Sequence, residues 1–371
     1  MDSPSTGSQP NLEKIYRMFS SPNETFQTEI AQMIAKAHFG NAFSQLAKTQ
    51  EWFTSLVTEW RLKSHSISEI WQPEYSNLSW LLLDGGCLKS QDIARAALIM
   101  SQSCDSSSWC WTANEPHDFR LGERFLKARS LELVENANDL PTLLKDGEPV
   151  DCNLFDSLQR LGLSNDVVFN NRIANVKHTK VFPFKISKGG WDNQLWLDAV
   201  QFMEQVSPVY ADWAQRLLTV IVPIEAEDGY QISASYRHRC GEVAMSWRVR
   251  PEQMAEIMIH EASHQHFFLA GMLSAYDDGS DQQLYYSPVV KKHRPIRKIL
   301  LAYHAFANVL LFYRHAHNAL AGEERKWLLK ESEKIMNELE ELEVPLRSTK
   351  ALTPLGRALW EPLSVQLNET T

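Results

Sequence analysis

The feature that most constrains this chain is a pair of histidines four residues apart, in the sequence HEASH at residues 260–264. Residues four apart lie on one face of an α-helix, so both imidazoles can reach one metal ion. The flanking sequence supports a helix, because Ile257, His260, His264 and Phe268 share one stripe. Two histidines on an apolar face each need a hydrogen-bond partner, and a shared metal satisfies both. We therefore expect a metal-binding helix with both histidines on a buried face, and the helical context disfavours a chance match.

Two known ways of completing such a metal site do not fit the sequence. The metzincin pattern requires glycine and histidine three and six residues after the second histidine, where this chain has Phe267 and Ala270. A thermolysin-like site requires a downstream glutamate, and the sequence has none between Glu261 and Glu323. The only acidic residues in that interval are aspartates in a polar loop: Asp277, Asp278 and Asp281.

Histidines elsewhere in this region are the remaining candidates for a third ligand. His266 is two residues from His264 and falls on the opposite side of the helix, which excludes it. His304 lies in the middle of a second predicted helix, on an apolar stripe with Leu300, Leu301, Ala307 and Leu311. The residues leave two roles open for His304, a metal ligand or a hydrogen-bonded core residue.

Glu261 is the catalytic candidate of the motif, and its role depends on the reaction. In a metallopeptidase it would be the general base. In an oxygenase it would be a ligand or an acceptor that orients an imidazole.

The fold class expected from the spacing of apolar residues is mainly α (α+β), with a small β element before the motif helix. The predicted boundaries divide the chain into a disordered lead-in over 1–11, an N-terminal helical region over 12–190 that could recognise substrate, and a catalytic domain over 191–371. The β-prone stretch runs from Val220 to Val249, with Gly241 at a turn, and VFPFKISKGGW over 181–191 is expected to be extended. Helices are expected over 11–47, 51–61, 91–102, 118–135, 193–220 with a break near Pro208, 251–271, 297–317, 323–342 and 354–367.

Composition argues against several classes of partner. The chain has 371 residues and a formal net charge of −9, with no concentrated basic face, which disfavours nucleic-acid binding. The longest apolar run, Ile299–Tyr313, is too short to span a bilayer and carries His304 and Asn308, and we expect no membrane association. The first residues contain neither a basic nor an apolar region, so we expect no secretory signal. The five cysteines include no Cys-x-x-Cys, which favours free thiols in the cytoplasm. The oligomeric state stays open.

Several blocks resemble one enzyme family. The shared features are HEASHQ, then YYSP, then Arg-Pro at 294–295, and then a histidine, His304, followed by Ala-Phe-Ala. The segments VSPVYADWAQRLLTVIVPIE at 206–225 and LTPLGRAL at 352–359 add to this likeness. Over about residues 200–360 the chain resembles the HExxH-type, α-ketoglutarate-dependent peptide β-hydroxylases of ribosomal natural-product (RiPP) biosynthesis. One departure is Val289-Val290, where the family often has Trp-Arg.

The resemblance implies an oxidoreductase, specifically an Fe(II) dioxygenase that uses α-ketoglutarate to hydroxylate a side-chain β-carbon of a ribosomally made precursor peptide. It implies that His260 and His264 are ligands and that His304, which matches the family's downstream histidine, is the third. Imidazole suits Fe(II) and Zn(II) equally, so the side chains alone do not choose between them.

The far carboxylate of α-ketoglutarate requires a cation, and the planar fork of arginine fits it well. Arg294, in the family-like Arg-Pro pair, is the first candidate and Arg297 the second, with hydroxyls from Tyr286 and Ser287 as further donors. A solvated basic cluster is the alternative explanation of this Lys- and Arg-rich segment.

Three hypotheses follow from these observations. The first is the iron and α-ketoglutarate hydroxylase, and the second is a zinc metallopeptidase with an unusual third ligand. The third is a catalytically silent binding protein on the same scaffold. The missing downstream glutamate disfavours the second, and the intact histidine set disfavours the third.

Overall fold

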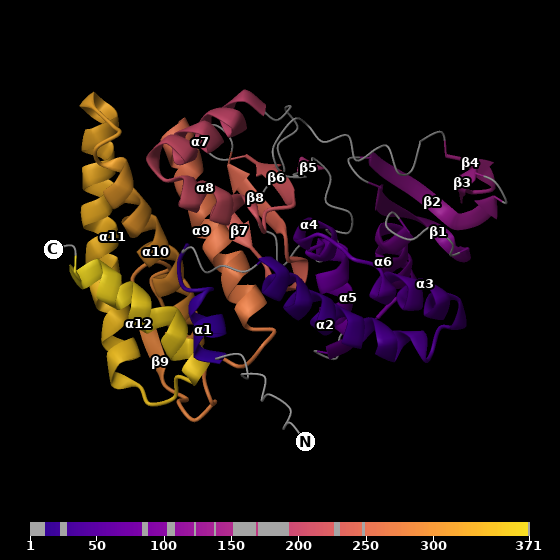
Figure 1. Cartoon of the computed structure of the whole chain (residues 1–371), viewed down its shortest axis with the longest axis horizontal. Coiled ribbons are helices and arrows are strands. Elements are labelled where there is room, and N and C mark those ends of the chain that lie inside the picture. The colour runs from indigo at the N-terminus through magenta and orange to yellow at the C-terminus, as the bar shows by residue number, and fades with distance from the viewer. Residues whose placement is uncertain are drawn as a thin grey trace, which may run out of the picture. The chain divides into compact units, whose positions relative to one another are not determined.

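The fold is described from a computed structural model (Figure 1), and its helices and small sheets confirm the expected mainly α (α+β) class. The structure describes residues 12–22, 28–83, 88–101, 108–121, 124–136, 139–150, 168–169, 193–225, 231–246 and 249–369. The predicted lead-in over 1–11 and the predicted extended segment over 181–191 lie outside these residues.

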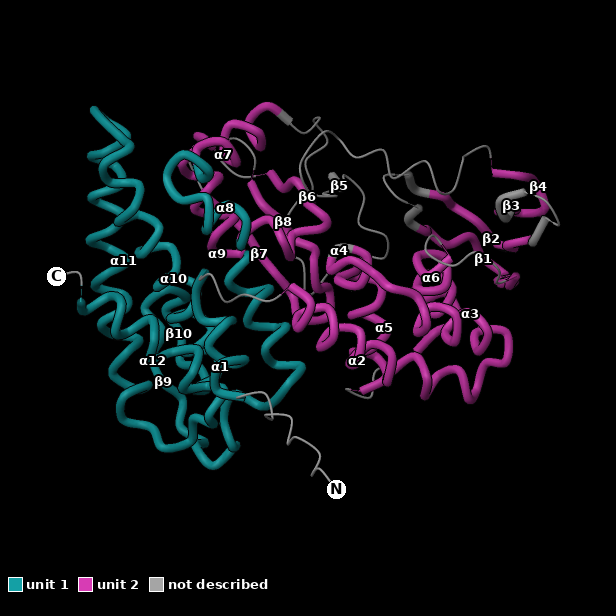
Figure 2. The backbone as a smooth tube through the Cα atoms, in the orientation of Figure 1, with its two compact units in different colours: residues 1–27, 203–213, 262–371 teal, residues 28–202, 214–261 magenta. Residues whose placement is uncertain are grey.

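The chain divides into two compact units, drawn in teal and magenta in Figure 2. Unit 1 contains residues 1–27, 203–213 and 262–371, and unit 2 contains residues 28–202 and 214–261. This division differs from the predicted boundary near residue 190, because the motif helix contributes its first part to unit 2 and its second part to unit 1.

In unit 2, aromatic side chains hold the N-terminal helices together. Phe43 lies at the centre of this cluster, with edge-on ring contacts to Trp60 at 5.3 Å and to Tyr75 at 5.2 Å between centroids. All three side chains are buried, and such pairs add to the stability that burial provides. The helices are α2 (Thr28–Ala47), α3 (Glu51–Leu62), α4 (Ile67–Ile70), α5 (Pro73–Leu83) and α6 (Ser90–Ser101).

An antiparallel sheet follows these helices, and it shows that the predicted helix over 118–135 is wrong. Leu131 and Leu133 are buried while Glu132 between them is exposed, which is the two-residue period of a strand. Leucine, lysine, arginine and glutamate favour helix locally, and cross-strand pairing overrides that preference. The strand order is β1-β2-β3-β4, with β1 (Trp109–Leu121), β2 (Arg124–Asn136), β3 (Asp139–Lys145) and β4 (Glu148–Pro149).

The small sheet before the motif helix is present, as predicted. Its strand order is β5-β6-β8-β7, with parallel β5–β6 and β6–β8 pairs and an antiparallel β7–β8 pair. Gly241 adopts a φ of 82° before β8, a backbone conformation that favours glycine. The elements are α7 (Asn193–Val206), α8 (Pro208–Gln215), β5 (Val168–Phe169), β6 (Val220–Ile224), β7 (Ser233–Ser235), the 3₁₀ helix η2 (Arg237–Arg239) and β8 (Glu242–Ser246).

Unit 1 is built around one buried helix, α10 (Ile296–Ala316), which packs against α11 and α12. The expectation that this apolar run is too short to span a bilayer is wrong, because the 21-residue α10 is long and apolar enough to cross a membrane. Within the fold, 78% of its apolar window is buried. Other elements of unit 1 are α1 (Leu12–Arg17), the second part of α9 (Pro251–Ala270), β9 (Leu284–Ser287), β10 (Lys292–Pro295), α11 (Gly322–Ser348) and α12 (Pro354–Glu369).

Candidate metal centre

The HEASH motif lies on α9, as predicted, and its histidines occupy the least buried face of that helix. After the first residue of α9, the only side chains that are not fully buried are Gln253, Glu256, His260 and His264. Their spacing of three, four and four residues places them on one face. The expected buried face is present at Ile257 and Phe268, while His260 and His264 on the same stripe keep partial access. An accessible pair can receive a ligand from outside.

The ring of His260 has protein surroundings that favour its neutral form, and the ring of His264 stacks on a neighbouring aromatic ring. Burial lowers the pKa of His260 to about 4, so its imidazole is neutral near pH 7, the form that binds metals. The ring of His264 stacks on Phe268, with 6.3 Å between ring centroids. Both rings are thus held on the accessible face of α9.

Glu261 points to a different side of α9, toward β7. Hydrogen bonds from the Ser233 and Ser235 side chains lower the pKa of this carboxyl, but burial outweighs them and raises the pKa to about 7. Its Oε2 atom has no hydrogen-bond partner among the described residues. The pKa of Tyr236 is raised by burial and by the charge of Glu261, which places this phenol in the same surroundings. The carboxyl is thus poised between its two protonation states at neutral pH.

His304 is fully buried on α10, and Nε2 lies 2.8 Å from the carbonyl oxygen of Phe19. Burial lowers the pKa of His304 to about 4, although the carbonyls of Phe19, Ser20 and Ser263 act in the opposite direction. The ring lies 5.8 Å from that of Phe267, between centroids. Its Nδ1 atom is buried and has no hydrogen-bond partner among the described residues. His304 is therefore a neutral imidazole with one nitrogen directed to the N-terminal segment.

His266 has a structural role on the far side of α9, in agreement with its exclusion as a ligand. Its ring stacks on Trp213 at 4.2 Å with the two planes nearly parallel, and Nε2 lies 3.1 Å from the Trp213 carbonyl oxygen.

Within the described part of the chain, no three His, Cys, Asp or Glu side chains are grouped closely enough to hold a metal ion. His260 and His264 fit a metal as a pair, because both present nitrogen donors on one accessible face. The buried Nδ1 of His304 is a third nitrogen donor of the same type. The three-histidine set stays a prediction.

Two of the loop aspartates, which were the acidic alternatives, accept hydrogen bonds from nearby residues. Asp281 accepts hydrogen bonds from the Tyr285 hydroxyl and the Thr349 hydroxyl, each at 2.8 Å, and these bonds lower the pKa of the carboxyl. Asp278 accepts from the Ser280 main chain and hydroxyl. These bonds shape the loop before β9.

The predicted cosubstrate residues lie on and beside a β-hairpin, which the sequence patterns above did not predict. Strands β9 and β10 pair with Arg294 opposite Tyr285. Because side chains alternate along strands, Arg294, Tyr285 and Ser287 share one face. Ser287 is fully buried, and its hydroxyl has no hydrogen-bond partner among the described residues. The hairpin therefore brings a guanidinium and an unsatisfied hydroxyl to one side.

The other two cosubstrate candidates are placed differently. Tyr286 lies on the opposite face of the hairpin, 47% exposed, with its ring 5.7 Å from that of His293. Arg297 is exposed in the first turn of α10. The two adjacent tyrosines at 285–286, a residue type enriched in strands, were the signal that could have identified the strand.

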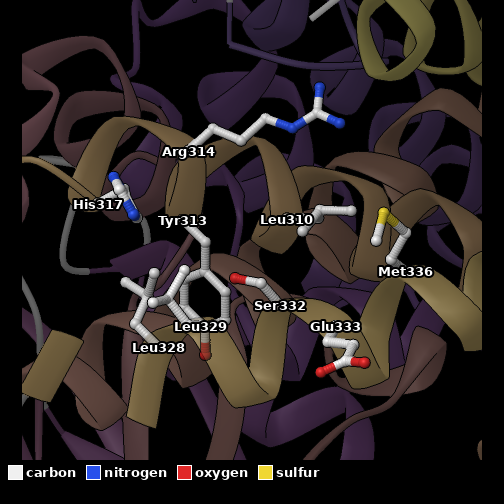
Figure 3. A pocket seen from close by; sticks show the side chains of 9 residues that line it. All are labelled: Leu310, Tyr313, Arg314, His317, Leu328, Leu329, Ser332, Glu333 and Met336. Atoms are coloured by element: carbon white, nitrogen blue, oxygen red, sulfur yellow. The ribbon is translucent and has the colours of Figure 1, made fainter. Parts of the chain in front are cut away.

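A hollow of about 400 Å³ lies between α10 and α11, away from the predicted residues (Figure 3). None of the predicted ligands or cosubstrate residues lines it. Its walls come from two helices and are mostly apolar: Leu310, Tyr313, Arg314, His317, Leu328, Leu329, Ser332, Glu333 and Met336.

Comparison of the chain with protein-family models and with curated proteins finds no match. The resemblance to the peptide β-hydroxylases stays a prediction carried by the motifs quoted above.

Proposed function

We propose that this protein is a cytoplasmic Fe(II)- and α-ketoglutarate-dependent hydroxylase that acts on a side-chain β-carbon of a ribosomally made precursor peptide. The observation that carries the proposal is the pair of imidazoles, His260 and His264, on the one accessible face of an otherwise buried helix. The missing glutamate downstream of the motif and the likeness of residues 200–360 to the hydroxylase family support the same reaction.

In this proposal His260 and His264 hold the iron, with His304 as the third ligand. When bound, iron would let dioxygen oxidise both substrates: one oxygen atom would enter the peptide C–H bond as a hydroxyl, and the other would enter succinate as α-ketoglutarate loses carbon dioxide. The chain contributes the ligands and an accessible face for the peptide.

Arg294 binds the far carboxylate of α-ketoglutarate, and the Ser287 hydroxyl, which lies on the same face of the hairpin, donates a second hydrogen bond. Glu261 lies beside the first ligand and is held by two serines of β7. Its role is to fix the motif helix and to accept a proton from a neighbouring group, since a carboxyl with a pKa near 7 exchanges protons at neutral pH.

A zinc metallopeptidase is the second candidate, and one observation favours it. The carboxyl of Glu261 has its pKa raised to about 7, close to the working pH that suits a general base. Against this candidate, α10 provides no glutamate as a third ligand.

The decisive experiment measures succinate formation. The full chain is loaded with Fe(II) without oxygen, mixed with α-ketoglutarate and exposed to air, with His264→Ala as the matched control. We expect succinate above the protein-free blank from the wild type and not from the variant. Succinate at blank level from the iron-loaded wild type, with hydrolysis of peptides by the zinc-loaded protein, would support the peptidase instead. The absence of both activities would favour a silent binding protein.

A further inference from the structure

Strand β7 forms one edge of the small sheet in unit 2, and it is more accessible than the two strands inside that sheet. Every residue of β6 and β8 is buried, whereas Ser233, Ala234 and Ser235 of β7 are all partly exposed. In the part of the chain that the structure describes, β7 pairs with β8 alone, so its other side is an edge. An edge strand is a template for pairing with another extended chain.

The pairing with β8 determines which main-chain groups of β7 point to this edge. Opposite residues of an antiparallel pair alternately exchange main-chain hydrogen bonds or direct their N–H and C=O groups away from each other. The Ser246 N–H donates to the Ile232 carbonyl at 2.8 Å, so these two residues form a bonded pair. The register makes Ala234 and Ala244 the next bonded pair. The N–H and C=O of Ser233 therefore point to the outer edge, and those of the residue two positions later do the same.

The same strand runs beside the accessible face of α9. Gln231, just before β7, donates from Nε2 to Oε2 of Glu256 at 2.9 Å and to the Gln253 carbonyl at 3.3 Å. Farther along, the two serines of β7 donate to Glu261. Alternate residues of this segment thus contact α9 over its first half, and all of them belong to unit 2. The strand therefore lies next to the face of α9 that carries Glu256 and His260.

A short row of rings continues from the end of β7. Tyr236 follows the strand, its ring lies 5.6 Å from that of His238, and the His238 ring lies 5.1 Å from that of Trp80, between centroids. Trp80, on α5, is 38% exposed, and the other two side chains are partly exposed. Such rings offer apolar contact to the side chains of a bound chain. We call the outer edge of β7 together with these three rings the β7 surface.

We propose that the β7 surface binds the peptide substrate as an added β-strand, through main-chain hydrogen bonds at Ser233, so that alternate side chains of the peptide face the side of α9 that carries His260. This inference rests on the proposed peptide hydroxylation. Main-chain pairing accepts many sequences, and the side chains at alternate positions add specificity. The register of the peptide on β7 therefore selects which of its residues reaches the motif.

The first test selects peptides from a library of random decapeptides displayed on phage, with the metal-free full chain as the target. The selected peptides are synthesised and N-methylated at one or the other set of alternate residues. A strand directs the N–H groups of alternate residues to one partner, so one set of methyl groups should weaken binding by about tenfold or more and the other should change it little. Equal effects of the two sets, or a library that yields no binder, would overturn the proposal.

The second test locates the binding with two variants of one residue. Ser233→Pro and Ser233→Ala both lose the hydroxyl that reaches Glu261, but only proline loses the outward N–H, at an edge position where proline is tolerated. The affinity for a selected peptide should be about tenfold or more lower in Ser233→Pro than in Ser233→Ala. Equal affinities of the two folded variants would contradict the proposal. A dimer of the peptide-free protein that Ser233→Pro disrupts would also overturn it, because a second copy would then occupy the edge.

Hydrogen exchange of the wild type tests the same contact without a variant. The Ser233 amide should exchange faster than the Ala234 amide, which is directed to β8, and it should become protected when the selected peptide binds. A bound peptide that leaves the exchange of the Ser233 amide unchanged would show that the peptide binds elsewhere.

Peptide binding is measured without metal, so its result is separate from that of the succinate assay. Binding at β7 without succinate formation would keep this peptide site and remove the proposed hydroxylation. Succinate formation without peptide binding at β7 would keep the hydroxylase and remove this inference.

Discussion

Protonation of His304 should destabilise the metal-free protein as the pH falls from about 6.5 toward about 4. The ring is fully buried, and burial lowers its pKa from the ordinary 6.5 to about 4. The unfolded chain therefore takes up this proton more readily than the folded one. The stabilising contribution is fully present above about pH 6.5 and is lost progressively as the pH falls to about 4. At 1.36 kcal/mol per pKa unit, the loss is on the order of 3 kcal/mol.

His304→Gln isolates this contribution, because glutamine can still donate to the Phe19 carbonyl but does not titrate in this range. Native-state hydrogen exchange of the α10 amides, in buffer with a chelator, measures the free energy of opening that helix. As the pH falls from about 7 to about 4, the opening free energy of the wild type should decrease by about 3 kcal/mol relative to that of the variant. Parallel pH curves for the two proteins would refute the reasoning.

Leu311→Ala is the control on the same helix. It removes buried apolar volume and no titratable group, and it should lower the opening free energy by about 2–5 kcal/mol at every pH.

Three further predictions concern other parts of the chain. Arg294→Ala should raise the α-ketoglutarate concentration needed for succinate formation by about tenfold or more, since a charge-assisted hydrogen bond contributes about 1.5–3 kcal/mol. Arg297→Ala should leave that concentration unchanged. The opposite result for the two variants would show that Arg297, and not Arg294, binds the carboxylate. Gly356→Ala should lower the midpoint of thermal unfolding, because the added Cβ would lie 2.2 Å from the Tyr276 carbonyl oxygen, and an unchanged midpoint would disprove that contact. Cys240 should resist alkylation at about pH 8 in the folded protein, since burial raises the pKa of its thiol to about 12. Peptide mapping that finds Cys240 alkylated as fast in the folded protein as in the urea-unfolded protein would contradict this.

The helices after residue 190 could be predicted because their local signals agree with their packing. Pro251 marks the start of α9, Pro208 separates α7 from α8, and the apolar stripe of α10 is buried as its spacing indicates. Where proline and helical periodicity coincide, the local preference and the buried face specify the same structure.

The N-terminal sheet could not be predicted in the same way. The segment around Leu131 and Leu133 is rich in helix-favouring residues, and only its pairing with β1 and β3 selects the strand. Pairing partners are a tertiary property, and local spacing does not reveal them. The hairpin of β9 and β10 was missed because each strand has only four residues.

The histidine pair of the candidate site could be predicted from spacing, but its surroundings could not. His304 and Phe19 are 285 residues apart in the chain, and no local pattern predicts their hydrogen bond. The partial exposure of His260 and His264 also depends on which elements pack against α9. The sequence therefore predicted which side chains could act as metal ligands, but it did not predict which atoms hold those side chains in position.

The central claim is that α9 binds a metal ion through His260 and His264, and the iron content of the reconstituted full chain tests it most directly. The wild type should hold about one Fe(II) per chain after removal of excess metal, and His264→Ala and His304→Ala should each lose nearly all of it while keeping their circular dichroism spectra. An iron content of about one per chain in folded His304→Ala would show that His304 is not a ligand and would make Glu261 the next candidate. Full iron in folded His264→Ala, or none in the wild type, would contradict the account.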